Sequence, residues 1–127
     1  MLKSKQITMK SFEDLEVYKK SFLFTVSIFV LTNKTSINRN IVNQLERASL
    51  SISNNIAEGF ELQSNKQFVK FLYIAKGSCG ECRNLLSVAN KLKQVESDKH
   101  KELINNAIEI SKQLANFIKY LKKSEIQ

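Results

Sequence analysis

A row of polar side chains of four chemical types is the feature of this sequence best suited to chemistry. It combines amide, guanidinium, hydroxyl and carboxylate groups, three or four residues apart: Gln44, Arg47, Ser51, Asn55 and Glu58. On a helix, that spacing places them in one line beside an apolar stripe. The row is either a hydrogen-bonded network at a helix–helix or subunit boundary, or a recognition groove for an anion or a peptide. The sequence favours the network, because buried polar groups are nearly always hydrogen bonded.

A second segment, residues 77–82, belongs to the same prediction. Ser78 and Glu81 are three apart and could face the polar row, with Arg47 forming an ion pair with Glu81 or Glu58. Gly77 and Gly80 weaken a helix, so we expect them to let another helix approach closely. The predicted structural polar network therefore has seven members: Gln44, Arg47, Ser51, Asn55, Glu58, Ser78 and Glu81.

Cysteine and histidine content excludes most metal and redox chemistry. Cys79 and Cys82 match C-x-x-C, but they lie in mid-helix on an apolar stripe, which favours two inert core thiols over a redox pair. The one histidine, His100, has Ser97 three residues before it, so the Glu-x-x-His elements of di-iron bundles are absent. We predict no metal, no cofactor and no catalytic residue.

The net charge of +8 permits an anionic partner. The positive residues concentrate between Lys66 and Lys123, and Lys3, Lys5 and Lys10 add to them near the N-terminus. The candidate nucleic-acid contacts, which mix cations with an aromatic ring, are Lys66, Lys70, Tyr73, Lys76, Arg83, Lys112 and Lys119. RNA or DNA binding and a merely solvated lysine-rich surface both remain open.

Four segments of helical periodicity position these residues. The helices are expected at about 12–32, 39–60, 65–92 and 98–122, with candidate N-terminal caps at Ser11, Ser36 or Asn38, Ser64 and Ser97. Their lengths and short connections predict an all-α, antiparallel up-and-down four-helix bundle, and residues 1–127 read as a single domain. No secretory signal is readable, and the apolar stretch at 22–31 is too short to span a membrane, so we expect a cytoplasmic protein.

The first of these helices is apolar on more than one side. Its expected core stripe is Leu15, Tyr18, Phe22, Val26 and Phe29. Phe24, Ile28 and Leu31 fall outside that stripe. Because one bundle core covers only one face of a helix, these three residues are predicted to form a subunit interface.

The residues quoted above also carry a family resemblance. Several runs of the sequence resemble the bacterial 23S rRNA intervening-sequence proteins: those at 44–48, 51–59 and 71–78, with Phe68, Glu81, Phe12 and Leu15. The resemblance implies a small non-enzymatic helical bundle. A related branch, the accessory proteins of diversity-generating retroelements, implies a homo-oligomer, with a pentamer as the expected ring, that binds nucleic acid and a reverse transcriptase. A protein-interaction scaffold without nucleic-acid binding is the alternative.

Overall fold

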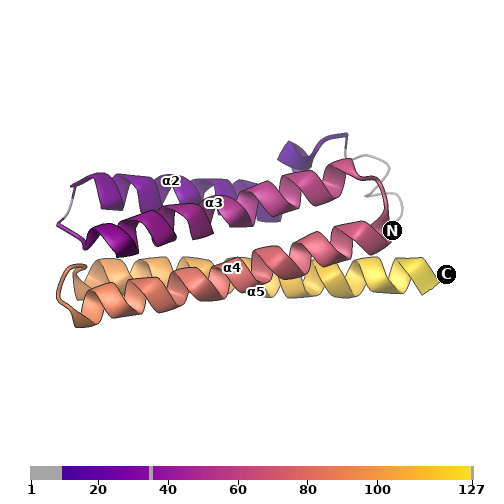
Figure 1. Ribbon diagram of the computed structural model, residues 1–127. Coiled ribbons are helices and arrows are strands. Elements are labelled where there is room, and N and C mark those ends of the chain that lie inside the picture. Colours follow the sequence, from indigo (N-terminus) through magenta and orange to yellow (C-terminus); the bar gives the residue numbers. More distant parts are fainter. Residues whose placement is uncertain (1–9, 35, 127) are drawn as a thin grey trace.

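Four long helices follow one another in antiparallel order. The computed structural model describes residues 10–34 and 36–126. A single 3-10 turn, η1 (Phe12–Asp14), precedes the helices α2 (Glu16–Lys34), α3 (Arg39–Glu61), α4 (Asn65–Lys91) and α5 (Ser97–Ile126), and these residues include no strand. The connections lie at alternating ends of the molecule (Figure 1). The expected up-and-down four-helix bundle is confirmed.

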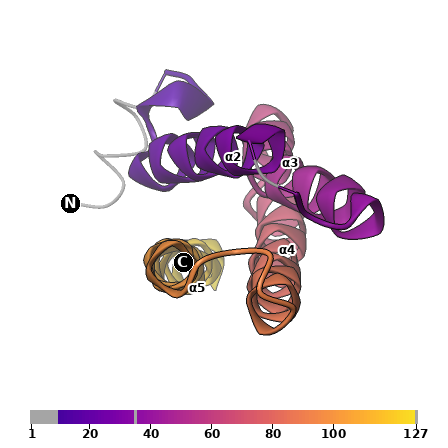
Figure 2. The ribbon, with the colours of Figure 1, turned by 90° about the vertical axis from the view of Figure 1, so that its left-hand side faces the viewer.

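The bundle has two layers. Viewed along its length, α2 and α3 form one layer, while α4 and α5 form the other (Figure 2). Large aliphatic side chains with no solvent exposure fill the space between the helices: Leu45, Ile52, Ile56, Leu72, Leu86, Leu103, Leu114 and Leu121. The 3.6-residue period of α3, α4 and α5 places these residues on the inner side of each helix.

Local caps set the ends of the central helices. The Asn38 side chain accepts hydrogen bonds from the backbone N–H of Asn40 and Ile41, and Ser64 accepts one from Gln67. Ser97, expected to precede the last helix, is instead its first residue. The Asn38 and Ser64 caps satisfy backbone N–H donors that a helix N-terminus leaves unpaired.

The first helix begins later than the sequence predicts. Asp14 Oδ2 accepts hydrogen bonds from the backbone N–H of Lys10 and Ser11, at 3.1 and 3.3 Å. This capping arrangement closes only η1, because Leu15 has an extended backbone and α2 starts at Glu16. Leu15 itself is buried, so the extended residue still contributes to the core.

The buried face of α2 is the reverse of the expected one. Phe24, Ile28 and Leu31, predicted to form a subunit interface, are 2%, 0% and 8% exposed within a single chain. The prediction that these three residues form a subunit interface is therefore wrong. The exposed apolar residues are instead Phe22, Leu23, Val26, Phe29 and Val30, which we call the α2 apolar face.

Hydroxyl groups explain this reversal. Ser21, Thr25 and Thr32 lie on the buried side of α2, where a hydropathy pattern counts them as polar. Thr25 Oγ1 is 2.9 Å from both the Ser21 and the Ser49 carbonyl oxygens. Thr32 Oγ1 donates to Glu46 Oε2 at 2.6 Å. These bonds satisfy the hydroxyls inside the α2–α3 contact, so the polar residues are buried without an unpaired donor.

Close helix approach occurs at a different glycine from the two that the sequence suggests. A Cβ on Gly59 would lie 2.8 Å from both Phe68 Cδ1 and Phe71 Cβ, so Gly59 allows α3 to pack tightly on α4. A Cβ on Gly77 would meet nothing within 4 Å, and one on Gly80 would meet only the Arg83 guanidinium, at 3.8 Å. The expected approach of another helix of this chain to Gly77 and Gly80 is therefore wrong.

Candidate nucleic-acid interface

One half of the α4–α5 layer carries positive charge alone. Residues 65–80 contain three lysines and residues 112–123 contain four, and neither segment contains Asp or Glu. Both segments are helical, and α4 packs directly against α5. The sequence thereby brings two acid-free lysine segments together on adjacent helices.

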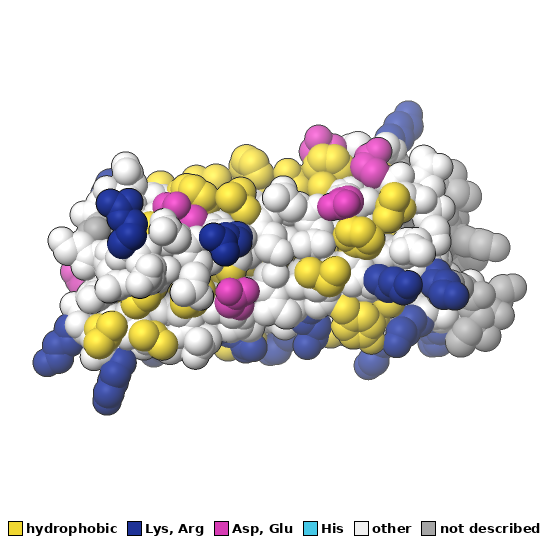
Figure 3. Space-filling view, viewed as in Figure 1, with side chains coloured by type: hydrophobic (Ala, Val, Ile, Leu, Met, Phe, Trp, Pro, Cys, Tyr) yellow, Lys and Arg dark blue, Asp and Glu magenta, His cyan; other side chains and the backbone are white. Residues whose placement is uncertain are grey.

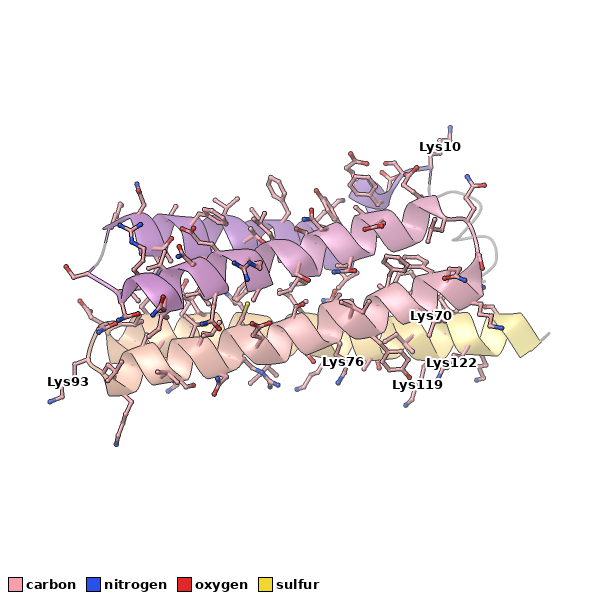
Figure 4. All side chains as sticks on the ribbon, viewed as in Figure 1. Lys10, Lys70, Lys76, Lys93, Lys119 and Lys122 are labelled. Atoms are coloured by element: carbon pink, nitrogen blue, oxygen red, sulfur yellow. The ribbon has the colours of Figure 1, made fainter. Side chains whose placement is uncertain are left out.

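The predicted contact residues of these two segments are exposed. Lys66, Lys70, Tyr73, Lys76, Lys112 and Lys119 all have exposed side chains. The labelled members Lys70, Lys76, Lys119 and Lys122 lie along the same edge of the α4–α5 layer (Figure 4). In the space-filling view, Lys and Arg side chains lie along much of the lower edge, where apolar side chains are also present, and further apolar side chains lie along the upper edge (Figure 3). We call the set Lys66, Lys70, Tyr73, Lys76, Lys112, Lys119 and Lys122 the lysine face.

A direct contact joins the two halves of the lysine face. Lys122 Nζ donates a hydrogen bond to Tyr73 Oη at 3.0 Å and lies 5.2 Å from the centre of the Tyr73 ring. Lys122 is not among the contacts predicted from the sequence. The sequence could have indicated this residue, because Lys122 follows Lys119 by three positions and residues three apart share a helix face.

Arg83 differs from the other candidate contacts. Its side chain is only partly exposed, and its Nε is buried without a hydrogen-bond partner. The guanidinium lies along its own helix beside Gly80 and contributes positive charge near Cys79. We therefore leave Arg83 outside the lysine face.

The centre of the polar row forms a bridge between α3 and α4. Ser78 Oγ donates to Ser51 Oγ at 2.8 Å. Asn55 Nδ2 donates to the Ser51 hydroxyl at 3.0 Å and to the Ser51 carbonyl oxygen at 2.7 Å. Ser51 and Asn55 are partly buried and Ser78 is buried, so these three members form the kind of hydrogen-bonded network that the sequence favoured.

The outer members of the row lie at the surface. Gln44, Arg47, Glu58 and Glu81 are exposed. Among the side chains that the structure describes, those of residues 10–34 and 36–124, ion pairs join only Lys19 to Glu16 and Lys99 to Glu102. The expected pairing of Arg47 with Glu81 or Glu58 is therefore wrong. Charged side chains that are exposed to water gain little free energy from forming an ion pair. This accounts for the absence of a pair between Arg47 and either glutamate.

The two cysteines are buried and reduced. Burial raises the pKa of both the Cys79 and the Cys82 thiol to about 12, and the nearby Arg83 opposes this at Cys79 without reversing it. A thiol is nucleophilic only as a thiolate, so neither sulfur is activated. Among the described residues, no group of three His, Cys, Asp or Glu side chains could hold a metal ion.

The single histidine has a partner that the sequence did not reveal. His100 is partly buried rather than solvent-exposed, and its Nε2 lies 3.1 Å from Ser87 Oγ. Ser87 lies in the interior of α4, where backbone N–H groups are used by the helix. Those backbone groups are thus unavailable as oxyanion-hole donors beside Ser87.

The geometry defines a basic, all-α four-helix bundle in which the excess of Lys and Arg over Asp and Glu lies in the α4–α5 layer. Residues 13–116 match the family of 23S rRNA-intervening sequence proteins, and the chain belongs to that family. The resemblance of the sequence to this family is confirmed. No curated protein matches the chain.

A solved structure has the same fold. It is the crystal structure of a protein of unknown function from the S23 ribosomal protein family of Bacteroides thetaiotaomicron. The two chains are 28% identical and superimpose with a TM-score of 0.75, over 81% of this chain and 95% of the other. Over the part of the chain that the structure describes, no helix is long and apolar enough to cross a membrane.

Proposed function

We propose that this chain is a non-enzymatic, homo-oligomeric protein that binds RNA or DNA through the lysine face. The observation that carries this proposal is the pairing of two acid-free lysine segments on adjacent helices, residues 65–80 and 112–123. Lysine ammonium groups bind phosphate as point charges, and a nucleic acid offers phosphates in a regular line. A surface that served solubility alone would have no need to exclude acidic residues.

The oligomeric part of the proposal rests on the α2 apolar face. Phe22 is 50% exposed, and Leu23, Val26, Phe29 and Val30 are exposed beside it. A contiguous apolar surface of this kind on a single chain commonly marks an interaction site. We therefore assign the subunit interface to this face, in place of Phe24, Ile28 and Leu31, and we place the protein in the cytoplasm, where reduced thiols persist.

Charge reversal on the lysine face tests the function. The double variant Lys66→Glu, Lys70→Glu should bind a labelled oligonucleotide at least ten-fold more weakly than the unaltered chain in a filter-binding assay. The control Lys10→Glu, Lys34→Glu changes the net charge equally, and neither residue belongs to the lysine face. It should lose much less affinity. Equal losses in the two double variants, or no binding by the unaltered chain, would contradict the proposal.

A second candidate function is a protein-interaction scaffold or accessory subunit, for example for a reverse transcriptase, without nucleic-acid contact. A groove of about 630 Å³ between α2 and α3 favours it. Its lining includes Phe22, Val26, Phe29 and Leu50, with Glu46 among its polar residues. Capture of a defined protein partner that is lost in Val26→Glu, together with no oligonucleotide binding, would support this function against the first.

A further inference from the structure

Tyr73 is the aromatic side chain at the centre of the lysine face. It is 50% exposed, and Lys70 and Lys76 lie three residues before and after it on the same helix. Lys122 reaches it from α5. An exposed ring that is surrounded by cations on two helices differs from the other two tyrosines, whose side chains are partly buried.

Half of the Tyr73 side chain is open to solvent. The Lys122 ammonium lies over the hydroxyl end of the ring, 3.0 Å from the hydroxyl oxygen and 5.2 Å from the ring centre. Within residues 10–34 and 36–126, Tyr73 is in contact with no other aromatic ring, whereas Tyr18 packs against Phe12 at 4.9 Å and Tyr120 stacks with Phe117. A planar ligand could therefore lie on the exposed part of the Tyr73 ring without displacing another aromatic ring.

We propose that Tyr73 is a stacking platform for an unpaired base, and that the ligand of the lysine face is single-stranded nucleic acid. This inference rests on the proposed function. Base–aromatic stacking tolerates any sequence, because every base has a π-face, and adjacent lysines bind the phosphates on either side of the stacked nucleotide. Lys122 holds the ring at its hydroxyl end and supplies one of those cations.

A duplex would gain nothing from the ring. Inside a double helix both faces of each base are covered by its neighbours, so only the backbone phosphates would contact the lysine face. The ring therefore gives the surface a preference for single strands, while the lysines alone give affinity for any polyanion.

Two substitutions at one position separate stacking from the hydroxyl contact. Tyr73→Leu removes the aromatic ring and should weaken binding of an oligothymidine single strand roughly 5- to 150-fold. Tyr73→Phe retains the ring and loses only the bond to Lys122, so it should stay within about three-fold of the unaltered chain. Binding of a duplex of the same length should change little in either variant.

A tryptophan probe reports stacking directly. The chain contains no Trp, so Tyr73→Trp introduces a single fluorophore whose emission a stacked base should quench. Leu92→Trp is the matched control, since Leu92 is 54% exposed and lies outside both the lysine face and the α2 apolar face. Single-stranded oligonucleotide should quench the emission of the Tyr73→Trp variant and leave that of the Leu92→Trp variant unchanged.

The outcomes distinguish failure of the stacking platform from failure of nucleic-acid binding. Loss of single-strand affinity in Tyr73→Leu, with duplex affinity retained, supports the stacking platform. Equal affinity of Tyr73→Leu and the unaltered chain for single strands, or equal quenching in the two tryptophan variants, overturns it while leaving nucleic-acid binding intact. No binding of either nucleic acid by the unaltered chain overturns the proposed function itself.

Discussion

The hydroxyl of Ser78 donates a hydrogen bond to the hydroxyl of Ser51, joining α4 to α3 across 2.8 Å. Ser51 also accepts from Asn55, so one hydroxyl serves two donors. Removing Ser51 therefore affects more partners than removing Ser78. This bridge is the least exposed part of the predicted polar network.

A double-mutant cycle on this bridge should show coupling. We expect Ser51→Ala to cost about 1–2 kcal/mol of unfolding free energy, and Ser51→Ala with Ser78→Ala to reveal a coupling of about 0.5–1.5 kcal/mol. Denaturant unfolding of the four proteins measures both quantities. Gln44→Ala, at the exposed end of the row, is the control and should stay within about 0.5 kcal/mol. Strict additivity of the two serine variants would show that the bridge carries no energy.

Two glycine substitutions should have opposite effects. Gly59→Ala forces a methyl group to within 2.8 Å of Phe71 Cβ, which the backbone holds in place, and should destabilise the chain by about 1–3 kcal/mol. Gly77→Ala meets open space in a helix interior and should stabilise it by about 0.5–1 kcal/mol. Thermal unfolding measures both. Destabilisation by Gly77→Ala would reveal a contact at Gly77 that the single chain lacks.

The two sides of α2 should respond differently to substitution. Phe24→Ala opens a cavity in the core and should cost about 3–5 kcal/mol. Phe22→Ser with Val26→Ser removes exposed apolar surface and should lower the mass measured by light scattering to that of one chain. A single-chain mass for the unaltered protein would refute the α2 interface.

Thiol ionisation gives a pH dependence of defined sign. In the folded chain the pKa of Cys79 and of Cys82 is raised to about 12, from an ordinary value of 9.0. Below pH 9 the thiols are protonated in both the folded and the unfolded chain, so their full contribution to the free energy of unfolding is retained. Between pH 9 and 12 only the unfolded chain loses it, so stability falls by at most about 1.4 kcal/mol per pH unit for each thiol.

The difference between the unaltered chain and Cys79→Ala, Cys82→Ala isolates this contribution from lysine and tyrosine ionisation. The variant should show the shallower decline in unfolding free energy above pH 9. At pH 8 the thiols of the folded protein should also resist an aromatic disulfide reagent that reacts at once after unfolding. Rapid reaction without unfolding would contradict their burial.

The features that depend on local sequence were predictable. Helix number and the caps at Asn38 and Ser64 depend on neighbouring residues, and the sequence predicts them to within a few positions. Exposure of Lys66 and Lys70 follows from their charge. The buried face of α2 was not predictable in this way, because Thr25 satisfies its hydroxyl on a carbonyl of α3 that only the tertiary structure supplies.

In the candidate site, too, local features were predictable from the sequence and long-range contacts were not. Helical spacing alone placed Ser51 and Asn55 in one row. The contact of Lys122 with Tyr73 spans 49 positions, and the close approach at Gly59 depends on how α3 packs on α4. Such long-range contacts leave no periodic signal in one sequence, so the sequence suggested the lysines of the interface without showing how its two halves meet.

The salt dependence of binding tests the central claim most directly. For a single-stranded oligonucleotide, the slope of log association constant against log salt concentration should be about −3 for roughly four phosphate contacts. Lys70→Gln and Lys119→Gln, from the two helices, should each reduce its magnitude by about 0.7. The control Lys34→Gln should leave it unchanged. A slope near zero, or one that neither lysine-face variant alters, would contradict nucleic-acid binding by the lysine face.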